Sequence, residues 1–119
     1  MPAKFQIKKA KSGEFYFNLL AGNGEIILTS EMYKAKASAK NGIRSVQKNS
    51  TVDARFEKRA SKSGKPFFVL KAANHEVIGK SEMYESDKSC DNGMASVKKN
   101  APGASTEDLS LAAAAAGKS

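Results

Sequence analysis

The chain has 119 residues, of which 40% are hydrophobic and 27% are charged, and its formal net charge is +8. This length fits one domain, and the composition is ordinary for a globular protein. No stretch approaches the roughly 20 apolar residues that span a bilayer, so no membrane partner is expected, and the lone Cys90 excludes an internal disulfide.

The first residues, 1 to 4, have no apolar stretch behind a basic tip, as a secretory signal would have. A cytoplasmic location is therefore expected. From residue 5 onward the chain is duplicated: residues 5 to 49 recur at 56 to 100 with a constant offset of 51, and 21 of the 45 aligned pairs are identical. Two copies are too few for a solenoid and each is too small for its own core, so we expect one shared core with pseudo-two-fold symmetry.

Each copy begins with a pattern that predicts three strands. In the first copy Phe5 and Ile7 alternate with polar residues, a turn follows at 11–13, and an aromatic run covers 15–20. Asn23-Gly24 is a strong hairpin signal and leads into a third β-rich run at 25–29. The second copy repeats this order, with His75 in place of Gly24.

Each copy then changes to a helical period. From 35 to 48 the apolar stripe is Ala39, Gly42, Ile43 and Val46, and its second-copy equivalent is Cys90, Gly93, Met94 and Val97. Glycine inside a helix costs up to about 1 kcal/mol relative to alanine, so its presence in both copies indicates close packing of helix on sheet. Ser86 or Asp87 is expected to cap the second helix.

The sequence therefore predicts an α+β fold, a pseudo-two-fold tandem repeat of β-β-β-α units that form one antiparallel sheet with two helices packed on one face. The first repeat is assigned to 1–51, the second to 52–101 and a C-terminal tail to 102–119. The join at 50–55 has no Gly or Pro and is not a flexible linker. The tail has room for one short strand at 106–109, and its alanine-rich end is expected to be disordered.

Several motifs occur in order in both copies and together resemble those of the YegP-like family. The resemblance covers roughly residues 3–101 and is carried by Asn23-Gly24-Glu25, Ser30-Glu31-Met32-Tyr33, Gly42-Ile43-Arg44-Ser45-Val46, Lys71-Ala72-Ala73-Asn74, Ser81-Glu82-Met83-Tyr84 and Gly93-Met94-Ala95-Ser96-Val97-Lys98. It implies two three-strand-plus-helix units in one sheet, with exchange of the strands that follow the helices, here around Val52 to Lys58. The family is functionally uncharacterised and offers no catalytic residues to carry over.

The usual catalytic side chains are scarce. The one histidine, His75, falls in a predicted hairpin turn, and Cys90 replaces Ala39 on the packing stripe, where a small buried group is expected. A zinc site lacks enough soft ligands. We therefore expect no catalytic residues, no metal and no cofactor, and the protein is not expected to be an enzyme.

Two sets of residues are candidate binding sites. The first is a duplicated polar set, for which helix capping and local hydrogen bonds are the favoured explanation: Glu25, Ser30, Glu31, Tyr33, Glu76, Ser81, Glu82 and Tyr84. The second lies on the sheet face away from the helices, where alternation places Tyr16, Asn18, Phe67 and Val69.

These features favour a non-enzymatic cytoplasmic binding or interaction module whose partner is unknown. A protein partner or a homodimer would fit the sheet face or the groove between repeats. The alternative is weak binding of single-stranded RNA or DNA through the aromatic, Lys-rich face. Of the 20 basic residues 17 are Lys, and residues 1–55 carry net +6 against +2 for 56–119, so the first copy is the better site for a polyanion.

Overall fold

The computed structural model describes residues 3–110, which form seven strands, two α-helices and two short 3-10 helices. In chain order these are β1 (Lys4–Lys9), β2 (Phe15–Leu20), β3 (Ile26–Ser30), α1 (Lys36–Asn49), η1 (Asp53–Arg55), β4 (Phe56–Ala60), β5 (Pro66–Lys71), β6 (Val77–Lys80), α2 (Asp87–Asn100), η2 (Ala101–Gly103) and β7 (Ser105–Asp108). The expected order of three strands and a helix is found in both copies.

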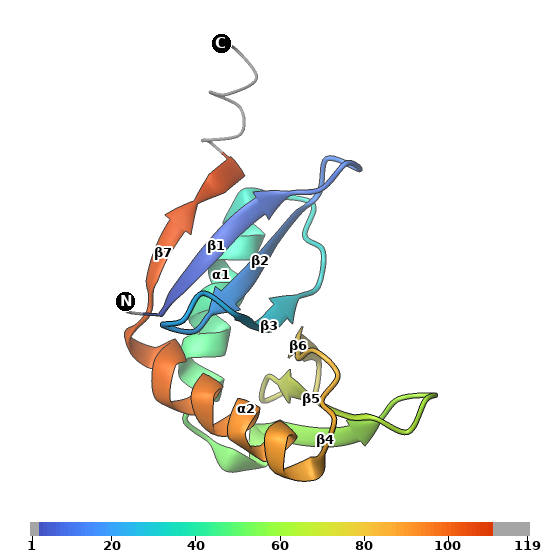
Figure 1. The fold of residues 1–119 in the computed structure, drawn as a ribbon. Helices are drawn as coiled ribbons and strands as arrows, with labels where there is room; N and C mark the ends of the chain where they lie inside the picture. Colours follow the sequence, from blue (N-terminus) through green and yellow to red (C-terminus); the bar gives the residue numbers. More distant parts are fainter. Residues whose placement is uncertain (1–2, 111–119) are drawn as a thin grey trace.

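The strands form one sheet in the order β4-β5-β6-β3-β2-β1-β7. The two copies meet at its centre, where β3 and β6 pair antiparallel through only two residue pairs, Thr29 with Lys80 and Ser30 with Gly79. The first six strands in this order are arranged symmetrically about that junction. Figure 1 shows the two triplets of strands above and below it, with β7 added beside β1 alone.

The last strand makes the sheet mixed, whereas a wholly antiparallel sheet was expected. β7 follows α2 but crosses to the first copy, where it pairs parallel with β1 from Lys4 with Ser105 to Ile7 with Asp108. The strand that follows α1 is β4, which pairs antiparallel with β5 of the second copy. The segment expected to exchange between copies, Val52 to Lys58, includes η1 and the first three of the five residues of β4.

Both helices pack on the same face of the sheet, as expected, because each copy's apolar stripe meets the buried side chains of the strands. The largest fully buried side chains are Phe5, Ile7, Phe17, Leu19, Leu28, Val46, Phe68, Val69, Leu70 and Val97. A Cβ on Gly42 would lie 2.5 Å from the Tyr33 hydroxyl and 2.9 Å from the Phe17 ring. The close packing predicted at this glycine is confirmed, and the neighbouring tyrosine is the group that requires it.

The turns and the second helix start follow local sequence signals. Gly24 has φ +86° in the β2–β3 turn, and His75, at the equivalent position of the β5–β6 turn, has φ 71°. Side-chain oxygens of Asn23 and Asn74 accept backbone hydrogen bonds two residues on, which stabilises both turns. Ser86 caps α2, since its side chain accepts a hydrogen bond from the backbone amide of Ser89.

Candidate functional site

The serines of the duplicated polar set have matching backbone partners. Ser30 Oγ accepts a hydrogen bond from the Phe17 amide at 2.9 Å and donates one to the Glu31 carbonyl at 2.8 Å. Ser81 Oγ makes the same two bonds, with the Phe68 amide and the Glu82 carbonyl, at the same distances. Both serines are buried, so their hydroxyls stabilise the strand ends and are not available to a ligand.

The charged and aromatic members of that set do not converge on a common hollow. Glu25, Glu31, Glu76 and Glu82 are all exposed. Tyr33 and Tyr84 pack against the helices, and their rings stack on Phe17 and Phe68 with 6.2 Å between centroids. Burial raises the pKa of both tyrosines, and the neighbouring carboxylate of Glu31 adds to the rise at Tyr33. A closed acid–base site between the glutamates is not formed by the described residues.

The four residues expected on the sheet face away from the helices are less accessible than a binding surface requires. Asn18 is 4% exposed, Phe67 9% and Val69 2%, and only Tyr16 keeps an intermediate exposure. The Lys80 ammonium lies 5.0 Å from the centroid of the Phe67 ring, and Thr29 donates a hydrogen bond to Asn18. An aromatic ligand would have to displace Lys80 to stack on Phe67, so Tyr16 is the one accessible member of this set.

The remaining reactive side chains also lack a site. Cys90 is fully buried, as expected, and burial raises the pKa of its thiol, which disfavours the thiolate. His75 is exposed at its turn. Within residues 3–110 no three His, Cys, Asp or Glu side chains come together in a way that could hold a metal ion. Nor does this part of the chain contain a helix long and apolar enough to cross a membrane.

Two hollows between helix and sheet occupy equivalent positions in the two copies. The first groove, of about 350 Å³, is lined by Ile7, Lys40, Ile43, Arg44, Gln47, Thr106 and Asp108. The second groove, of about 360 Å³, is lined by Asp53, Phe56, Lys58, Asp91, Met94, Ala95 and Lys98. The offset of 51 converts the five residues that β1 and α1 contribute to the first groove into five residues of the second. The internal duplication has therefore produced two copies of one groove.

The grooves differ in what lies beside their outer strand. In the first groove Thr106 and Asp108 of β7 form part of the wall, and Phe5 of β1 is completely buried. In the second groove Phe56 is only partly buried, and among residues 3–110 no strand pairs with the outer edge of β4. Figure 1 shows β7 alongside β1 at one end of the sheet and β4 as the last strand at the other.

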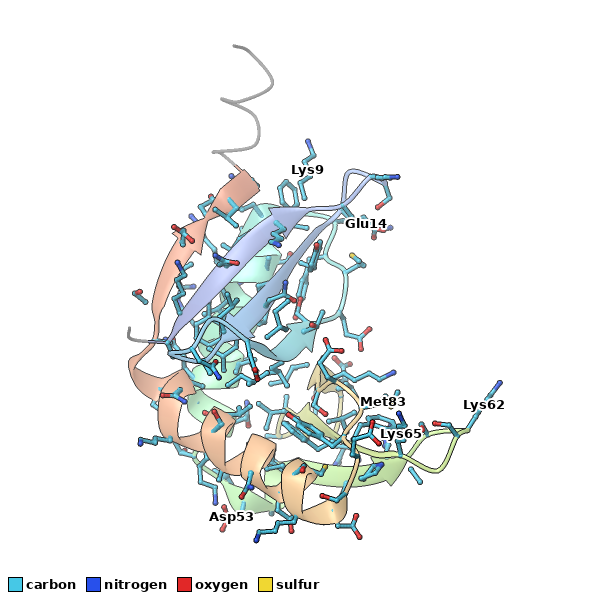
Figure 2. All side chains as sticks on the ribbon, viewed as in Figure 1. Lys9, Glu14, Asp53, Lys62, Lys65 and Met83 are labelled. Carbon is cyan, nitrogen blue, oxygen red and sulfur yellow. The ribbon has the colours of Figure 1, made fainter. Side chains whose placement is uncertain are left out.

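Charged side chains occupy the second groove and its edges. Lys58 forms ion pairs with Asp91 at 2.6 Å and with Asp87 at 4.0 Å, and Lys98 forms one with Asp53. Figure 2 labels Asp53 below α2, the helix that carries Lys98. The Asp91 carboxylate, by its hydrogen bond, raises the pKa of Lys58, so this lysine stays charged at neutral pH.

A third hollow, the basic groove, lies between α1 and the β5–β6 turn and has a volume of about 600 Å³. Arginine, lysine and asparagine dominate its wall, which contains no Asp or Glu: Asn41, Arg44, Ser45, Lys48, Asn49, Val52, Arg55, Ala72, Ala73 and Asn74. It contains two of the three arginines of the chain. The excess of positive charge in the first copy is thus partly concentrated here.

Sequence reasoning did not single out the residues of the second groove. The available signal was the divergence between copies, because the five pairs that line the equivalent walls are all different: Ile7 and Lys58, Lys40 and Asp91, Ile43 and Met94, Arg44 and Ala95, and Gln47 and Lys98. Such divergence could be noticed from the sequence, but the shared wall that joins these positions could not.

Comparison with known proteins places this fold in a family. A family model described as a domain of unknown function, DUF1508, matches residues 10–57 and 61–108, which differ by the same offset of 51. Each match contains two strands, a helix and the residues that follow it, so β7 belongs to the second match.

Similar proteins match most of the chain. A UPF0339 protein of Acinetobacter baylyi is 59% identical over 109 residues, which are 92% of this chain and 98% of the relative. The UPF0339 protein YegP of Yersinia pestis is 54% identical, over 90% of this chain and 96% of its own length.

Two solution NMR structures have the same fold. A UPF0339 protein of Shewanella oneidensis superposes with a TM-score of 0.87 at 49% identity, covering 93% of this chain and 94% of the other. The protein of unknown function yegP from E. coli superposes with a TM-score of 0.87 at 46% identity, covering 92% and 95%. The chain therefore belongs to the UPF0339 family, in which the DUF1508 unit occurs here twice in tandem.

Proposed function

We propose that the protein is a non-enzymatic binding module that holds a protein partner in the second groove, between α2 and β4. The observation that carries this proposal is the difference between the two grooves. One copy of the groove has a strand along its edge, whereas the outer edge of β4 has none within the described residues. An edge strand offers backbone donors and acceptors to which an extended peptide can add.

The hydrogen bonds and the burial of the reactive side chains support the non-enzymatic part of this proposal. Ser30 and Ser81 are tied to the backbone, the thiol of Cys90 is buried, and the glutamates of the polar set are exposed and dispersed. Acid–base catalysis needs a positioned group whose pKa is close to the working pH. No such group stands out among the residues described.

A blocked groove provides the test. Ala95 is an exposed residue of α2 that lines the second groove, and Ala95→Trp would place a large ring in it. Ala37→Trp is the matched control, because Ala37 is an exposed residue of α1 that lines none of the three grooves. Peptides selected from a displayed random library on the unmodified protein would then be measured against both variants.

We expect the selected peptides to bind Ala95→Trp at least tenfold more weakly, and Ala37→Trp with unchanged affinity. A tenfold loss corresponds to about 1.4 kcal/mol. Selected peptides that bind both variants equally well would contradict the proposal, and so would a library that yields no binder.

A second candidate function is the binding of single-stranded nucleic acid, which the basic groove favours. Arg44, Lys48 and Arg55 together offer three cationic groups in a hollow without a carboxylate in its wall. Arginine suits phosphate because its planar guanidinium can donate two parallel hydrogen bonds. This surface is a better candidate than the aromatic face, where only Tyr16 is accessible.

Salt and two variants distinguish these surfaces. Affinity for a labelled RNA or DNA strand should fall steeply with salt, because each phosphate contact releases a counterion. Arg44→Ala combined with Lys48→Ala should abolish binding, whereas Tyr16→Ala should leave it unchanged. Binding that is lost only in Tyr16→Ala would place the site on the sheet face, and no binding at low salt would exclude nucleic acid as the partner.

A further inference from the structure

We propose that the second groove accepts an extended peptide segment of a partner protein parallel to β4, in the register that β7 takes on β1, with an apolar, an acidic and a basic residue in succession. This inference rests on the proposed function, which makes the groove the partner site. It adds the direction of the bound strand, its register and the charges that it must carry.

The register follows from the duplication. On β1 the pairs with β7 are Lys4 with Ser105, Phe5 with Thr106, Gln6 with Glu107 and Ile7 with Asp108. The offset of 51 converts the four β1 residues into Arg55, Phe56, Glu57 and Lys58. Because the walls of the two grooves correspond by the same offset, a strand that lies on β4 as β7 lies on β1 would meet the second groove along its length.

The first position that matters is the one opposite Phe56. In the first copy it is held by Thr106, which lines the first groove beside Ile7. In the second copy Phe56 and Met94 are both partly buried side chains that line the groove. An apolar or threonine side chain here would cover the exposed part of the Phe56 ring, with a gain in proportion to the area removed from water.

The next position lies opposite Glu57, on the sheet face away from the helices, and favours an acidic residue. Its first-copy equivalent, Glu107, accepts a hydrogen bond from Gln6 and forms an ion pair with Lys4 at 3.3 Å. In the second copy Arg55 replaces Lys4, and Arg55 and Lys71 line one hollow with Glu57.

The carboxylate of Glu57 does not remove the preference for an acidic residue at this position. It already forms ion pairs with both Arg59 and Lys71. With Arg55 at the adjacent position, three cations face one carboxylate on this side of β4. A second carboxylate, supplied by the bound strand, would bring the local charge closer to neutral.

The last position lies opposite Lys58, on the helix side, and here the charge preference is reversed between copies. In the first copy it is held by Asp108, which forms an ion pair with Lys36 of α1 at 3.0 Å. The offset replaces Lys36 by Asp87 and Lys40 by Asp91.

The reversed charges at this position favour a cation from the partner. Lys58 forms ion pairs with both Asp87 and Asp91, so one ammonium faces two carboxylates. An aspartate in the bound strand would add a third carboxylate, whereas a lysine would bring the charges into balance. The bound segment must therefore differ from β7 at this position, and charge complementarity disfavours the β7 of a second copy as the occupant.

Two synthetic peptides provide the probe. One has the sequence of residues 104–110, and the other has the same sequence with Asp108→Lys. Each is titrated into the isotope-labelled full chain while the backbone amide signals of residues 55–60 and 91–98 are followed by NMR. An exposed ion pair stabilises only modestly, so exchanging a repulsive contact for an attractive one should strengthen binding about fivefold in favour of the lysine peptide.

A charge-reversed protein gives the matched control. In the variant with both Asp87→Lys and Asp91→Lys the preference should invert, so that the natural sequence binds more tightly than the lysine peptide. Both aspartates are exposed, so the cost to folding is confined to their ion pairs with Lys58 and to the charge at the start of α2, and the amide spectrum of the variant checks that it is folded.

Each result of the titration that differs from the expected one would overturn a defined part of the proposal. Equal binding of both peptides at β4 and α2 would overturn the charge preference and leave the groove as a strand acceptor. The same spectra contain the amide signals of β1 and α1, and shifts confined to these elements would mean that the peptides displace β7 and would overturn the assignment to the second groove. If neither peptide shifts any of these amides, the strand inference fails, while loss of selected binders in Ala95→Trp would still support the proposed function.

Discussion

In the first copy, Phe5 and Ile7 are completely buried beside β7, whereas in the second copy Phe56 is partly buried and Lys58 is exposed. The residues at which each helix packs on the sheet are nevertheless the same in both copies: Phe17 and Phe68, Tyr33 and Tyr84, Gly42 and Gly93, and Val46 and Val97. The duplicated fold has thus kept its core and diverged where one copy has a seventh strand beside it.

The two copies show how one added strand changes the residue types that the strand beside it can carry. A strand with partners on both sides can carry an apolar residue such as Ile7 at its covered edge. An open edge strand with the same residue would invite pairing with another chain, and charged residues on such edges prevent this. The run Glu57-Lys58-Arg59 at the open edge of β4 fits that role, and the same charges determine which peptides the groove accepts.

The largest effect is expected when the equivalent phenylalanines are truncated. Phe5→Ala should lower the free energy of unfolding by about 3–5 kcal/mol, since a fully buried phenylalanine leaves a cavity when truncated. Phe56→Ala should cost about 2 kcal/mol or less, because part of its ring is already exposed to water. Urea denaturation of both variants measures the difference, and equal losses would show that β7 does not protect the first copy.

The glycines of the two helices give the next largest effect. A Cβ at Gly93 would approach the Tyr84 hydroxyl and ring too closely, as at Gly42 with Tyr33. Gly42→Ala and Gly93→Ala should each cost about 1–3 kcal/mol through overpacking. Thermal unfolding measures this cost.

The control for the glycine variants is Gly103→Ala, where an added Cβ would meet no atom within 4 Å. It should leave the melting temperature unchanged. Adding Tyr84→Phe to Gly93→Ala should recover part of the lost stability, because the hydroxyl is the atom nearest to the new methyl group. A double variant as unstable as Gly93→Ala would mean that the hydroxyl is not the obstacle.

Local patterns in the sequence predicted most of the fold. The stripe Ala39, Gly42, Ile43 and Val46 indicated α1 and its buried face, and the residues Ser86 and Asn23-Gly24 indicated a helix start and a turn. These features depend on side chains within a few residues of one another, which is the range that a sequence pattern reports.

Contacts between distant parts of the chain were not predictable in the same way. The parallel pairing of β7 with β1 joins residues about a hundred positions apart, and the short polar run Ser105–Asp108 carries no alternation that reveals its neighbour. The limited exposure of Phe67 also depends on Lys80 of the neighbouring strand β6. For the same reason neither groove could be defined from the sequence, although the divergent pairs that line them were visible. The alanine-rich end expected to be disordered lies outside the described residues.

A smaller effect is expected from making β4 resemble β1. Lys58→Ile introduces the residue that the first copy has at this position and removes the charge from the open edge. Burying an isoleucine against a second chain contributes about 1.5 kcal/mol or more, so the self-association constant should rise about tenfold. Analytical ultracentrifugation measures this constant.

The matched control for that variant is Lys4→Ile, the same change on β1 at a residue that pairs with Ser105 of β7. It should leave self-association unchanged, because the edge beside it offers no free backbone groups. An equal rise in both variants would indicate general hydrophobic association. It would contradict the idea that the open edge of β4 promotes self-association.

The smallest effect is a difference in acid response between the two outer strands. The hydrogen bond from Gln6 and the neighbouring Lys4 lower the pKa of Glu107 on β7 below its ordinary value of 4.5. A carboxyl with a lowered pKa contributes stability above its unfolded pKa and loses it as the pH falls through the folded value. The contribution of Glu107 is therefore complete above about pH 4.5 and is lost below it.

The stabilising contribution of Glu57 on β4 is also lost as the pH falls, but the structural result expected for β4 is different from that for β7. Hydrogen bonds from Lys71 and Arg59 lower the pKa of Glu57 to about 2, so it titrates at the acid end of the range. At pH 3 the Glu57 carboxyl is therefore still largely ionised, and β4 has five residue pairs with β5, whereas β7 has four with β1. Lowering the pH from 6 to 3 should therefore shift the amide signals of β7 before those of β4. Glu107→Gln should reduce this shift and Glu76→Gln should not, and a β7 that responds to acid equally in all three proteins would mean that Glu107 does not hold it on β1.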